Sequence, residues 1–275
     1  MTSSAGIDGY RRYLAERDGP PDLLRHRLER REEFFAAIEA EPVRSRRTLD
    51  RDVFLRNLRR RHPEPGVGRE LTWMLATAKL NQAERFGVGL GELYGLVTTG
   101  NRPPEAVYVA LEEHYHTRLL AYVLDMFDLP FQVVPPPLVM RQFVKLSVFM
   151  PERPGIPFVG AAEMAGCVMF DELRRAGVAI FADEPDVAAR IDSLYSEILT
   201  DEIGHVGYCA ARCSPTGKMV MRRLYPLFAR LFARQTPEIL LVVDRRELHE
   251  RLGRPFDIAA LTHDLSTPTF VAAVP

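Results

Sequence analysis

Cysteine and lysine are scarce in this chain of 275 residues. Its only cysteines, Cys167, Cys209 and Cys213, are too few and too irregularly spaced for a disulfide framework or a Cys-x-x-Cys iron site. The chain contains only three lysines, so arginine carries nearly all of its positive charge. Extensive disulfide bonding and rubredoxin-type iron binding are therefore excluded.

Long apolar runs and strong net charge are also missing. No apolar stretch approaches the length of a membrane span, and the N-terminus lacks the basic and apolar regions of a signal peptide. We therefore expect a cytoplasmic protein without a membrane span. A formal net charge of −1 and a pI near 6.7 give no electrostatic reason to expect nucleic acid as a partner.

The chain is long enough to bury a sizeable core. With 47% hydrophobic residues in 275, residues 1–275 are most simply a single domain. The apolar residues recur mostly at helical spacing, which predicts an all-α protein.

Two Glu-x-x-His motifs lie within apolar, helix-patterned segments. They are Glu113 with His116, and Glu202 with His205. Residues i and i+3 of a helix point the same way, so each motif can offer a carboxylate oxygen and an imidazole nitrogen to one metal ion. One such motif is weak evidence, because the spacing also arises by chance.

Two further glutamates occur where a carboxylate is normally unfavourable. Glu84 lies between Leu80 and Val88 at helical spacing, and Glu163 lies in the apolar segment 158–170. A buried carboxylate is costly unless it is paired or coordinates a metal. Each glutamate alone is equally consistent with a protonated core group or with a partner of one of the many arginines.

The order of the four glutamates indicates two helical hairpins. Glu84 and Glu113 are 29 residues apart, and Glu163 and Glu202 are 39 residues apart. Each separation suits two antiparallel helices joined by a turn, and about fifty residues with Pro-rich stretches remain for a crossover between the hairpins. Turn signals divide the hairpins at residues 98–104 and 183–186.

This arrangement resembles the ferritin-like di-iron carboxylate proteins, whose bundle core takes a Glu from each of two helices and Glu-x-x-His from each of the other two. The resemblance covers residues 68–212, with residues 1–67 and 213–275 as flanking helical additions. It is most similar to the oxygenase branch, such as demethoxyquinone hydroxylases and aldehyde-deformylating oxygenases. It implies a four-helix bundle with one long crossover and the metal ligands Glu84, Glu113, His116, Glu163, Glu202 and His205.

The resemblance also implies roles for residues around the ligands. In this group an acidic residue before the Glu of each motif orients the histidine of the other motif. Asp201 would then orient His116, and Glu112 would orient His205. The position one turn after the third-helix Glu tends to line the oxygen pocket, which makes Cys167 a pocket candidate. For Cys209 we favour a role as a small apolar core residue.

Two ligand positions have rivals. Glu92 is flanked by apolar residues, as Glu84 is, and only the resemblance of spacing favours Glu84. Glu172 competes with Glu163, but it precedes a polar pattern and lies close to the turn at 183–186. We therefore prefer Glu84 and Glu163.

Three other segments carry expectations. The glycines after Glu84, at positions 87, 89, 91 and 95, indicate either close helix packing, which we favour, or a widened helix beside a cavity. Residues 138–150 are expected to form an amphipathic helix that caps the bundle or mediates a homodimer. The charged N-terminal segment, including residues 29–33, is interpreted as a helical layer with a solvated face and no direct functional role.

The ligand set suits iron or manganese better than zinc, because it combines hard oxygen and imidazole ligands without thiolate. We expect two iron ions, with a manganese-containing pair as the alternative. The first hypothesis is an oxygen-activating oxygenase or oxidase that hydroxylates, desaturates or N-oxygenates a small organic substrate, using O2 and an external reductase or ferredoxin. The second is iron oxidation, iron storage or peroxide reduction. The third is a metal-free helical protein that binds a partner.

Overall fold

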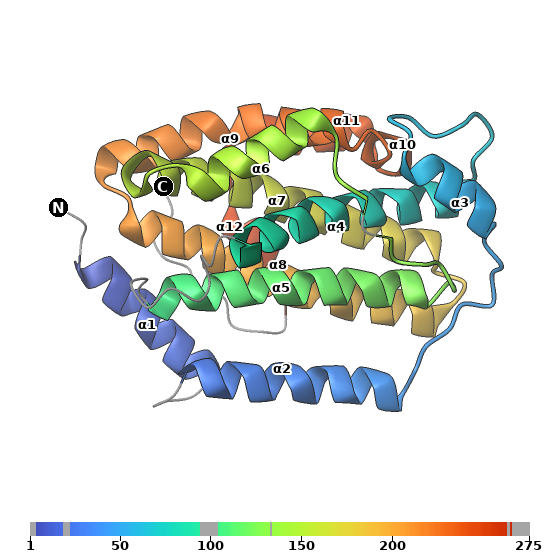
Figure 1. Ribbon diagram of the computed structural model, residues 1–275, viewed down its shortest axis with the longest axis horizontal. Coiled ribbons are helices and arrows are strands. Elements are labelled where there is room, and N and C mark those ends of the chain that lie inside the picture. Colours follow the sequence, from blue (N-terminus) through green and yellow to red (C-terminus); the bar gives the residue numbers. More distant parts are fainter. Residues whose placement is uncertain (1–3, 19–22, 94–103, 133, 263–264, 266–275) are drawn as a thin grey trace.

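The computed structural model describes residues 4–18, 23–93, 104–132, 134–262 and 265 (Figure 1). Within these ranges all regular secondary structure is helical, which confirms the all-α prediction for this part of the chain. The helices are α1 (Ser4–Asp18), α2 (Leu23–Ala40), α3 (Arg51–Leu58), α4 (Arg69–Leu93), α5 (Pro104–Asp125), α6 (Leu138–Phe149), α7 (Glu152–Ile180), α8 (Pro185–Arg212), α9 (Pro215–Gln235), α10 (Ile239–Val242), α11 (Arg245–Gly253) and α12 (Ile258–Thr262).

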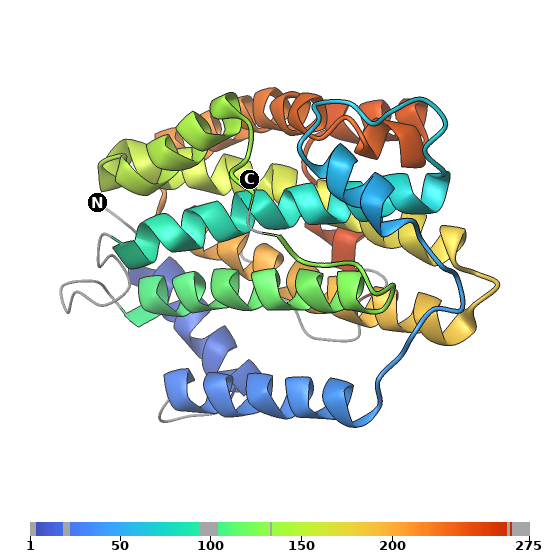
Figure 2. The ribbon, with the colours of Figure 1, turned by 45° about the vertical axis from the view of Figure 1, so that its right-hand side comes forward.

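Four long helices form the centre of the molecule. Helix α4 packs on α5 and helix α7 packs on α8, and the two pairs join through contacts of α5 with α8 and of α4 with α7. Figures 1 and 2 show these helices running roughly along the long axis of the molecule. Trp73 of α4 is fully buried between them, and its indole Nε1–H donates to the carbonyl of Leu173 in α7 at 2.8 Å.

The chain's turn signals mark several helix boundaries. Helix α5 begins at Pro104 and helix α8 begins at Pro185, as expected for a residue without a backbone N–H to satisfy in the first turn. Ser214 caps α9 by accepting from the backbone N–H of Gly217 at 3.1 Å. The predicted turn at 183–186 is confirmed, whereas most of the turn at 98–104 lies outside the described residues.

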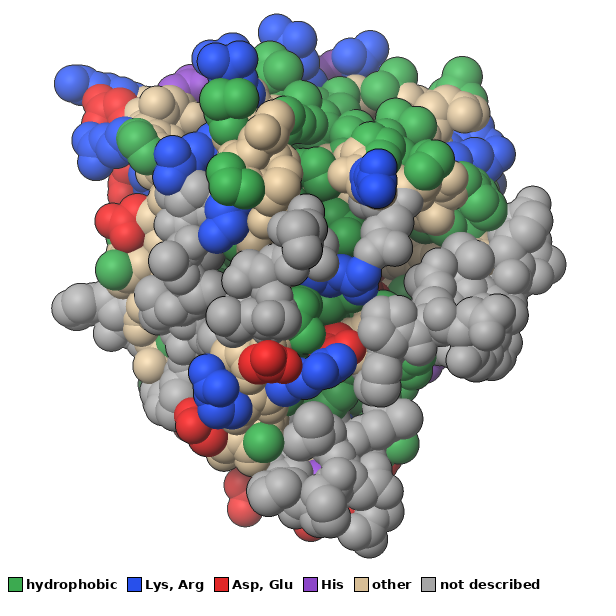
Figure 3. All heavy atoms as spheres, turned by 90° about the vertical axis from the view of Figure 1, so that its left-hand side faces the viewer, with side chains coloured by type: hydrophobic (Ala, Val, Ile, Leu, Met, Phe, Trp, Pro, Cys, Tyr) green, Lys and Arg blue, Asp and Glu red, His purple; other side chains and the backbone are tan. Residues whose placement is uncertain are grey.

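Helix α6 is the crossover helix between the two pairs. It packs against α4 and α7, and its Phe143 ring contacts Phe228 and Phe232 of α9 with centroid separations of 4.8 and 5.3 Å. The outer faces of α6 and α9 expose seven large apolar side chains and carry basic residues without a single acidic one. Figure 3 shows hydrophobic side chains interspersed with Lys and Arg on the upper part of one end of the molecule. The homodimer stays a prediction.

Helices α1 and α2 cover the other side of the central helices (Figures 1 and 2). Helix α1 packs on α8, and the side chains of Tyr10, Leu14 and Phe35 are buried. The segment 29–33 exposes Glu29, Glu32 and Glu33 as predicted, but Arg31 is only 1% exposed. Among the described helices, none has the combination of length and apolarity that crossing a membrane requires.

Candidate metal centre

Six side chains from the four central helices converge in the interior. Two overlapping groups each have four potential ligand atoms within 4.8 Å of one another. Glu113 and Glu202 belong to both groups, so each can contribute to two neighbouring ions. Glu84 and His116 complete the first group, and Glu163 and His205 complete the second. The structure therefore brings together all six of the ligands implied by the sequence.

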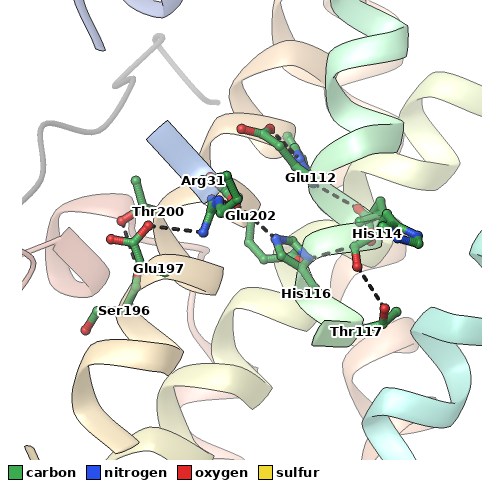
Figure 4. Close-up of polar contacts among 12 residues, drawn as sticks. Arg31, Glu112, His114, His116, Thr117, Ser196, Glu197, Thr200 and Glu202 are labelled. Atoms are coloured by element: carbon green, nitrogen blue, oxygen red, sulfur yellow. Dashed lines mark hydrogen bonds and ion pairs between the residues drawn. The ribbon is translucent and has the colours of Figure 1, made fainter. Parts of the chain in front are cut away.

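One nitrogen of each histidine faces the carboxylates. His116 Nδ1 lies 3.2 Å from Glu202 Oε1 and 3.7 Å from Glu113 Oε2. His205 Nδ1 lies 3.0 Å from Glu113 Oε1 and 3.9 Å from Glu163 Oε2. Figure 4 shows His116 turned toward Glu202. The two ring centroids are 5.7 Å apart, so the imidazoles flank the carboxylates from neighbouring positions.

The opposite ring nitrogens face two other carboxylates. His205 Nε2 lies 3.0 Å from Glu112 Oε2, and His116 Nε2 lies 3.4 Å from Asp201 Oδ2. These are the cross-helix partners that the resemblance implies. An Nε2–H that donates to a carboxylate leaves the lone pair on Nδ1, the nitrogen that faces the other glutamates. Glu112 and Asp201 can therefore fix the imidazole orientation that a metal ligand needs.

Burial and mutual repulsion raise the pKa of two of the glutamates. Burial, together with the negative charge of Glu113, raises the pKa of Glu84 well above its ordinary value. Burial, together with the charge of Glu202, raises the pKa of Glu163 in the same way. Both shifts follow from burying several carboxylates close to one another.

Contacts with histidine shift the other pKa values. Burial alone would raise the pKa of Glu113, but the nearby imidazoles of His116 and His205 outweigh burial and hold it well below its ordinary value. Burial alone would lower the pKa of His116, but Asp201, Glu113 and further carboxylates raise it well above its ordinary value. The pKa of His205 is raised for the same reason, led by Glu112. The site thus attracts positive charge.

The residues present fit a pair of divalent ions. Both ring nitrogens of His116 and Nδ1 of His205 are buried and make no hydrogen bond within the described part of the chain, although carboxylate oxygens lie close to all three. A bound cation would accept the nitrogen lone pair and would also neutralise the charge of the surrounding carboxylates. Four carboxylates and two imidazoles suit iron or manganese, which accept oxygen and nitrogen donors.

A cavity of about 570 Å³ borders this cluster. Its wall includes the carboxyl-bearing residues Glu84, Glu113, Glu163 and Glu202, and most of the remaining wall is apolar. Helix α6 closes one side, with Met140 among its lining side chains. Apolar binding pockets of this size, with a few polar groups at one point, are typical of small-molecule sites.

The structure describes the surroundings of two of the glycines after Glu84. Gly87 lines the cavity, and a Cβ at this position would lie 3.4 Å from Val144 Cγ1 of α6, which is an ordinary van der Waals contact. Helix α4 is α-helical at Gly87, so the cavity lies beside the helix without the helix being widened there. A Cβ at Gly89 would meet nothing within 4 Å, and the side-chain surroundings of positions 91 and 95 lie outside the described residues.

Only one of the two cysteines takes the position expected for it. Cys209 is a buried core residue, as expected, and also lines the cavity, whereas Cys167 is fully buried and is not among the lining residues. On α7 the cavity wall at this level is formed by Gly166 instead of its neighbour. A helix turns about 100° per residue, so the i+4 spacing from Glu163 to Cys167 did not fix which of the two adjacent residues faces the cavity.

Of the rival glutamates, Glu172 is placed elsewhere. It is 5% exposed and forms an ion pair with Arg251 of α11. The side chain of Glu92 lies outside the described residues. A separate residue on α8, Tyr195, is not among the residues that line the cavity. Its hydroxyl forms a hydrogen bond with the hydroxyl of Thr77 at 2.8 Å.

Sequence reasoning missed two arginines that contact the outer carboxylates. Arg17 of α1 and Arg31 of α2 are buried against Glu112 and Asp201. A signal was present: Arg17 extends the apolar stripe of α1 at helical spacing, and Arg31 precedes Phe34 and Phe35 on α2 in the same way. An arginine within an apolar stripe indicates a buried partner.

Comparisons with protein families, with curated proteins and with solved structures found no match to this chain. What the site does must therefore be argued from its own residues.

Proposed function

We propose that this chain is a ferritin-like di-iron protein of the oxygenase type, which uses O2 to oxidise a small, largely apolar organic molecule. The observation that carries the proposal is the cavity of about 570 Å³ whose wall includes four of the candidate ligand residues. A substrate held there would lie beside the metal ions and against a largely apolar wall. Hydroxylation, desaturation and N-oxygenation all need this proximity.

Each part of the site has a role in this proposal. The four glutamates and two histidines would hold two iron ions, or a manganese-containing pair, and Glu113 and Glu202 are the two residues shared by both ligand groups. When bound and reduced, such a metal pair supplies electrons for the activation of O2. Met140 and the other apolar lining residues would bind and orient the substrate and exclude water. An external reductase or ferredoxin would supply electrons.

Iron oxidation, iron storage or peroxide reduction is the alternative with the same ligands. These activities need no organic substrate, so they give the apolar cavity no role. Storage in particular needs a cage-sized assembly, whereas the oxygenase proposal is compatible with a monomer or a homodimer. Light scattering of the iron-loaded protein separates these sizes.

Transfer of oxygen to an organic molecule is the direct test. Iron-loaded protein with a chemical reductant and isotopically labelled O2 is incubated with a panel of small apolar compounds, and products are analysed by mass spectrometry. We expect at least one compound to be hydroxylated or N-oxygenated with labelled oxygen, or to lose two hydrogens. Consumption of O2 that stops once the iron is oxidised, in a cage-sized particle and without any organic product, would contradict the proposal.

Filling the cavity should block ligand binding while the metal site is retained. Ala110 lines the cavity one turn before Glu113, and Ala110→Phe would project a ring into the space. We expect the variant to bind metal like the wild type but to lose binding of a neutral fluorescent probe such as N-phenyl-1-naphthylamine by at least about tenfold. Fluorescence titration measures the change.

The matched control for this substitution is Ala37→Phe, which adds the same ring at an exposed position of α2. It should leave probe binding unchanged. Equal probe affinity in the wild type and in Ala110→Phe would show that the cavity is not the binding site.

A further inference from the structure

Arg17 of α1 connects the two carboxylates that stand behind the histidines. Its side chain is 2% exposed. One guanidinium nitrogen, Nη2, donates to Glu112 Oε1 at 2.6 Å, and the other, Nη1, donates to Asp201 Oδ1 at 3.4 Å. Arg17 therefore spans α5 and α8, the two helices that carry the Glu-x-x-His motifs.

In each of the two carboxylates, one oxygen faces Arg17 and the other oxygen faces a histidine. Glu112 uses Oε1 for Arg17 and Oε2 for His205 Nε2. Asp201 uses Oδ1 for Arg17, and its Oδ2 lies 3.4 Å from His116 Nε2. Glu112 is thus held by a guanidinium group through one oxygen and bonds an imidazole through the other, whereas Asp201 Oδ2 faces His116 and also has a second guanidinium partner.

Arg31 of α2 gives Asp201 a second guanidinium partner. Its Nη2 donates to Asp201 Oδ2 at 2.5 Å, and its side chain is 1% exposed. Its Nη1 donates to Glu197 Oε2 at 3.1 Å, at the partly solvated edge of the network, as Figure 4 shows. The guanidinium carbon also lies 5.3 Å from the ring centroid of Tyr115 on α5. Such contacts fix a planar guanidinium in one orientation.

Charge balance gives these arginines a reason to be buried. The four candidate ligand carboxylates, together with Glu112 and Asp201, carry six negative charges when ionised. Two divalent ions and the guanidinium groups of Arg17 and Arg31 carry six positive charges, and the partly exposed Glu197, which also contacts Arg31, adds a seventh negative charge. The four inner carboxylates then neutralise the two ions, and the arginines neutralise the two outer carboxylates. A buried carboxylate without such a partner would be strongly unfavourable.

We propose that Arg17 and Arg31 are positioning residues of the metal centre. They hold Glu112 and Asp201 in place, so that each carboxylate fixes one histidine with its Nδ1 toward the metal ions. The inference rests on the proposed role of the six inner residues as metal ligands. It gives helices α1 and α2 a direct part in the site, in contrast to the solvated layer expected from their sequence.

The test uses cobalt(II), a spectroscopic probe for iron(II) sites, in the full-length protein under anaerobic conditions. Metal affinity is measured by competition with a chelating indicator, and ligand geometry by visible absorption. Replacing an outer-shell partner of a metal ligand typically weakens metal binding 10–100-fold, and Arg17 acts through such partners. We therefore expect Arg17→Met to raise the Kd for cobalt by about tenfold and to alter the absorption bands.

The direction in which the Kd for cobalt changes in Arg17→Met distinguishes a positioning role of Arg17 from other roles. Removing a nearby positive charge would by itself strengthen the binding of a cation and lower the Kd. An arginine that only fills space would leave the Kd and the absorption bands as they are in the wild type. A raised Kd with altered bands supports the proposal, and either of the other outcomes overturns it. Arg17→Lys, which keeps the charge but loses the fork that reaches two carboxylates, should raise the Kd by a smaller factor.

Arg31→Met provides a second variant if Arg17→Met fails to fold. Because Arg31 contacts Asp201 and not Glu112, it should weaken mainly the ion beside His116, so one of two cobalt ions is released more readily. The matched control is Arg12→Met, which removes an exposed arginine of α1 and should change neither ion. A wild-type protein that binds no cobalt refutes the proposed function. A wild type that binds two ions, with both variants unchanged, refutes only the positioning role.

Discussion

Replacing Glu202 and His205 together by alanine is expected to abolish iron binding, from about two ions per chain in the wild type to none. Glu202 belongs to both groups of ligand atoms, so its loss removes a carboxylate from each candidate ion position. Loss of His205 removes the only imidazole of the second group. Elemental analysis after anaerobic reconstitution with iron(II) and desalting gives the metal content directly.

The control for this double variant is Glu172→Gln. Glu172 is also a buried glutamate on a central helix, but it pairs with Arg251 and belongs to neither ligand group. We expect Glu172→Gln to retain about two iron ions per chain. Retention of iron by the double variant would refute the site. Absence of iron from the wild type would favour a metal-free helical protein that binds a partner.

The two Glu-x-x-His motifs could be predicted from the sequence alone, whereas the choice of Glu84 over Glu92 depended on the resemblance. Helical periodicity forces Glu113 and His116 onto one face of α5, and Glu202 and His205 onto one face of α8. The separations along the chain then limit how the helices can pair. These are local rules and chain-length arguments, which a single sequence states without knowledge of tertiary packing.

The contacts that depend on rotation and docking of whole helices were not predicted. Whether Gly166 or Cys167 faces the cavity depends on a rotation of α7 that spacing alone leaves open. Likewise, Arg17 and Arg31 reach Glu112 and Asp201 across about 95 to 184 residues of chain. Charge patterning indicated a solvated face for this region, because it counts charges along a helix without their distant partners.

The cavity could not be predicted from the sequence. The glycines after Glu84 indicated either close packing, which we favoured, or space, and Gly87 lies beside both α6 and the cavity. Residues 138–150 were expected to cap the bundle or to mediate dimerisation. Helix α6 does cover the cavity with one face while its other face exposes Leu138 and Phe149, so the two expectations do not exclude each other.

The metal-free protein is expected to lose stability as the pH rises above neutrality. The pKa values of His116 and His205 are raised in the fold, so their contribution to stability is fully present below the ordinary value of 6.5 and is lost as the pH rises through the raised pKa values. Glu84 and Glu163 also have raised pKa values. The stability that they contribute therefore also falls as the pH rises above their ordinary pKa of 4.5. The melting temperature should therefore fall as the pH rises above 6.5.

Glu113 acts in the opposite direction but over a different range of pH. Its pKa is lowered by His116 and His205, so its contribution is present above the ordinary value of 4.5 and is lost only as the pH falls through the lowered pKa. It therefore does not offset the loss expected above neutrality. Thermal melts of the metal-free protein at several pH values check this. A melting temperature that stays constant or rises as the pH is raised above 6.5 would contradict the expectation.

Metal loading should reverse this dependence, because bound ions take the place of the protons that the ligands otherwise hold. Metal affinity then rises with pH, and so does the difference in melting temperature between loaded and metal-free protein. Free metal at a thousand times the Kd of a site stabilises the folded state by about 4 kcal/mol, or roughly 8–16 °C in a protein of this size. The Glu202→Ala, His205→Ala variant is the control: it should show no metal-dependent rise at any pH, because both ligand groups are incomplete. A rise of equal size in that variant would mean that the metal stabilises the fold from elsewhere.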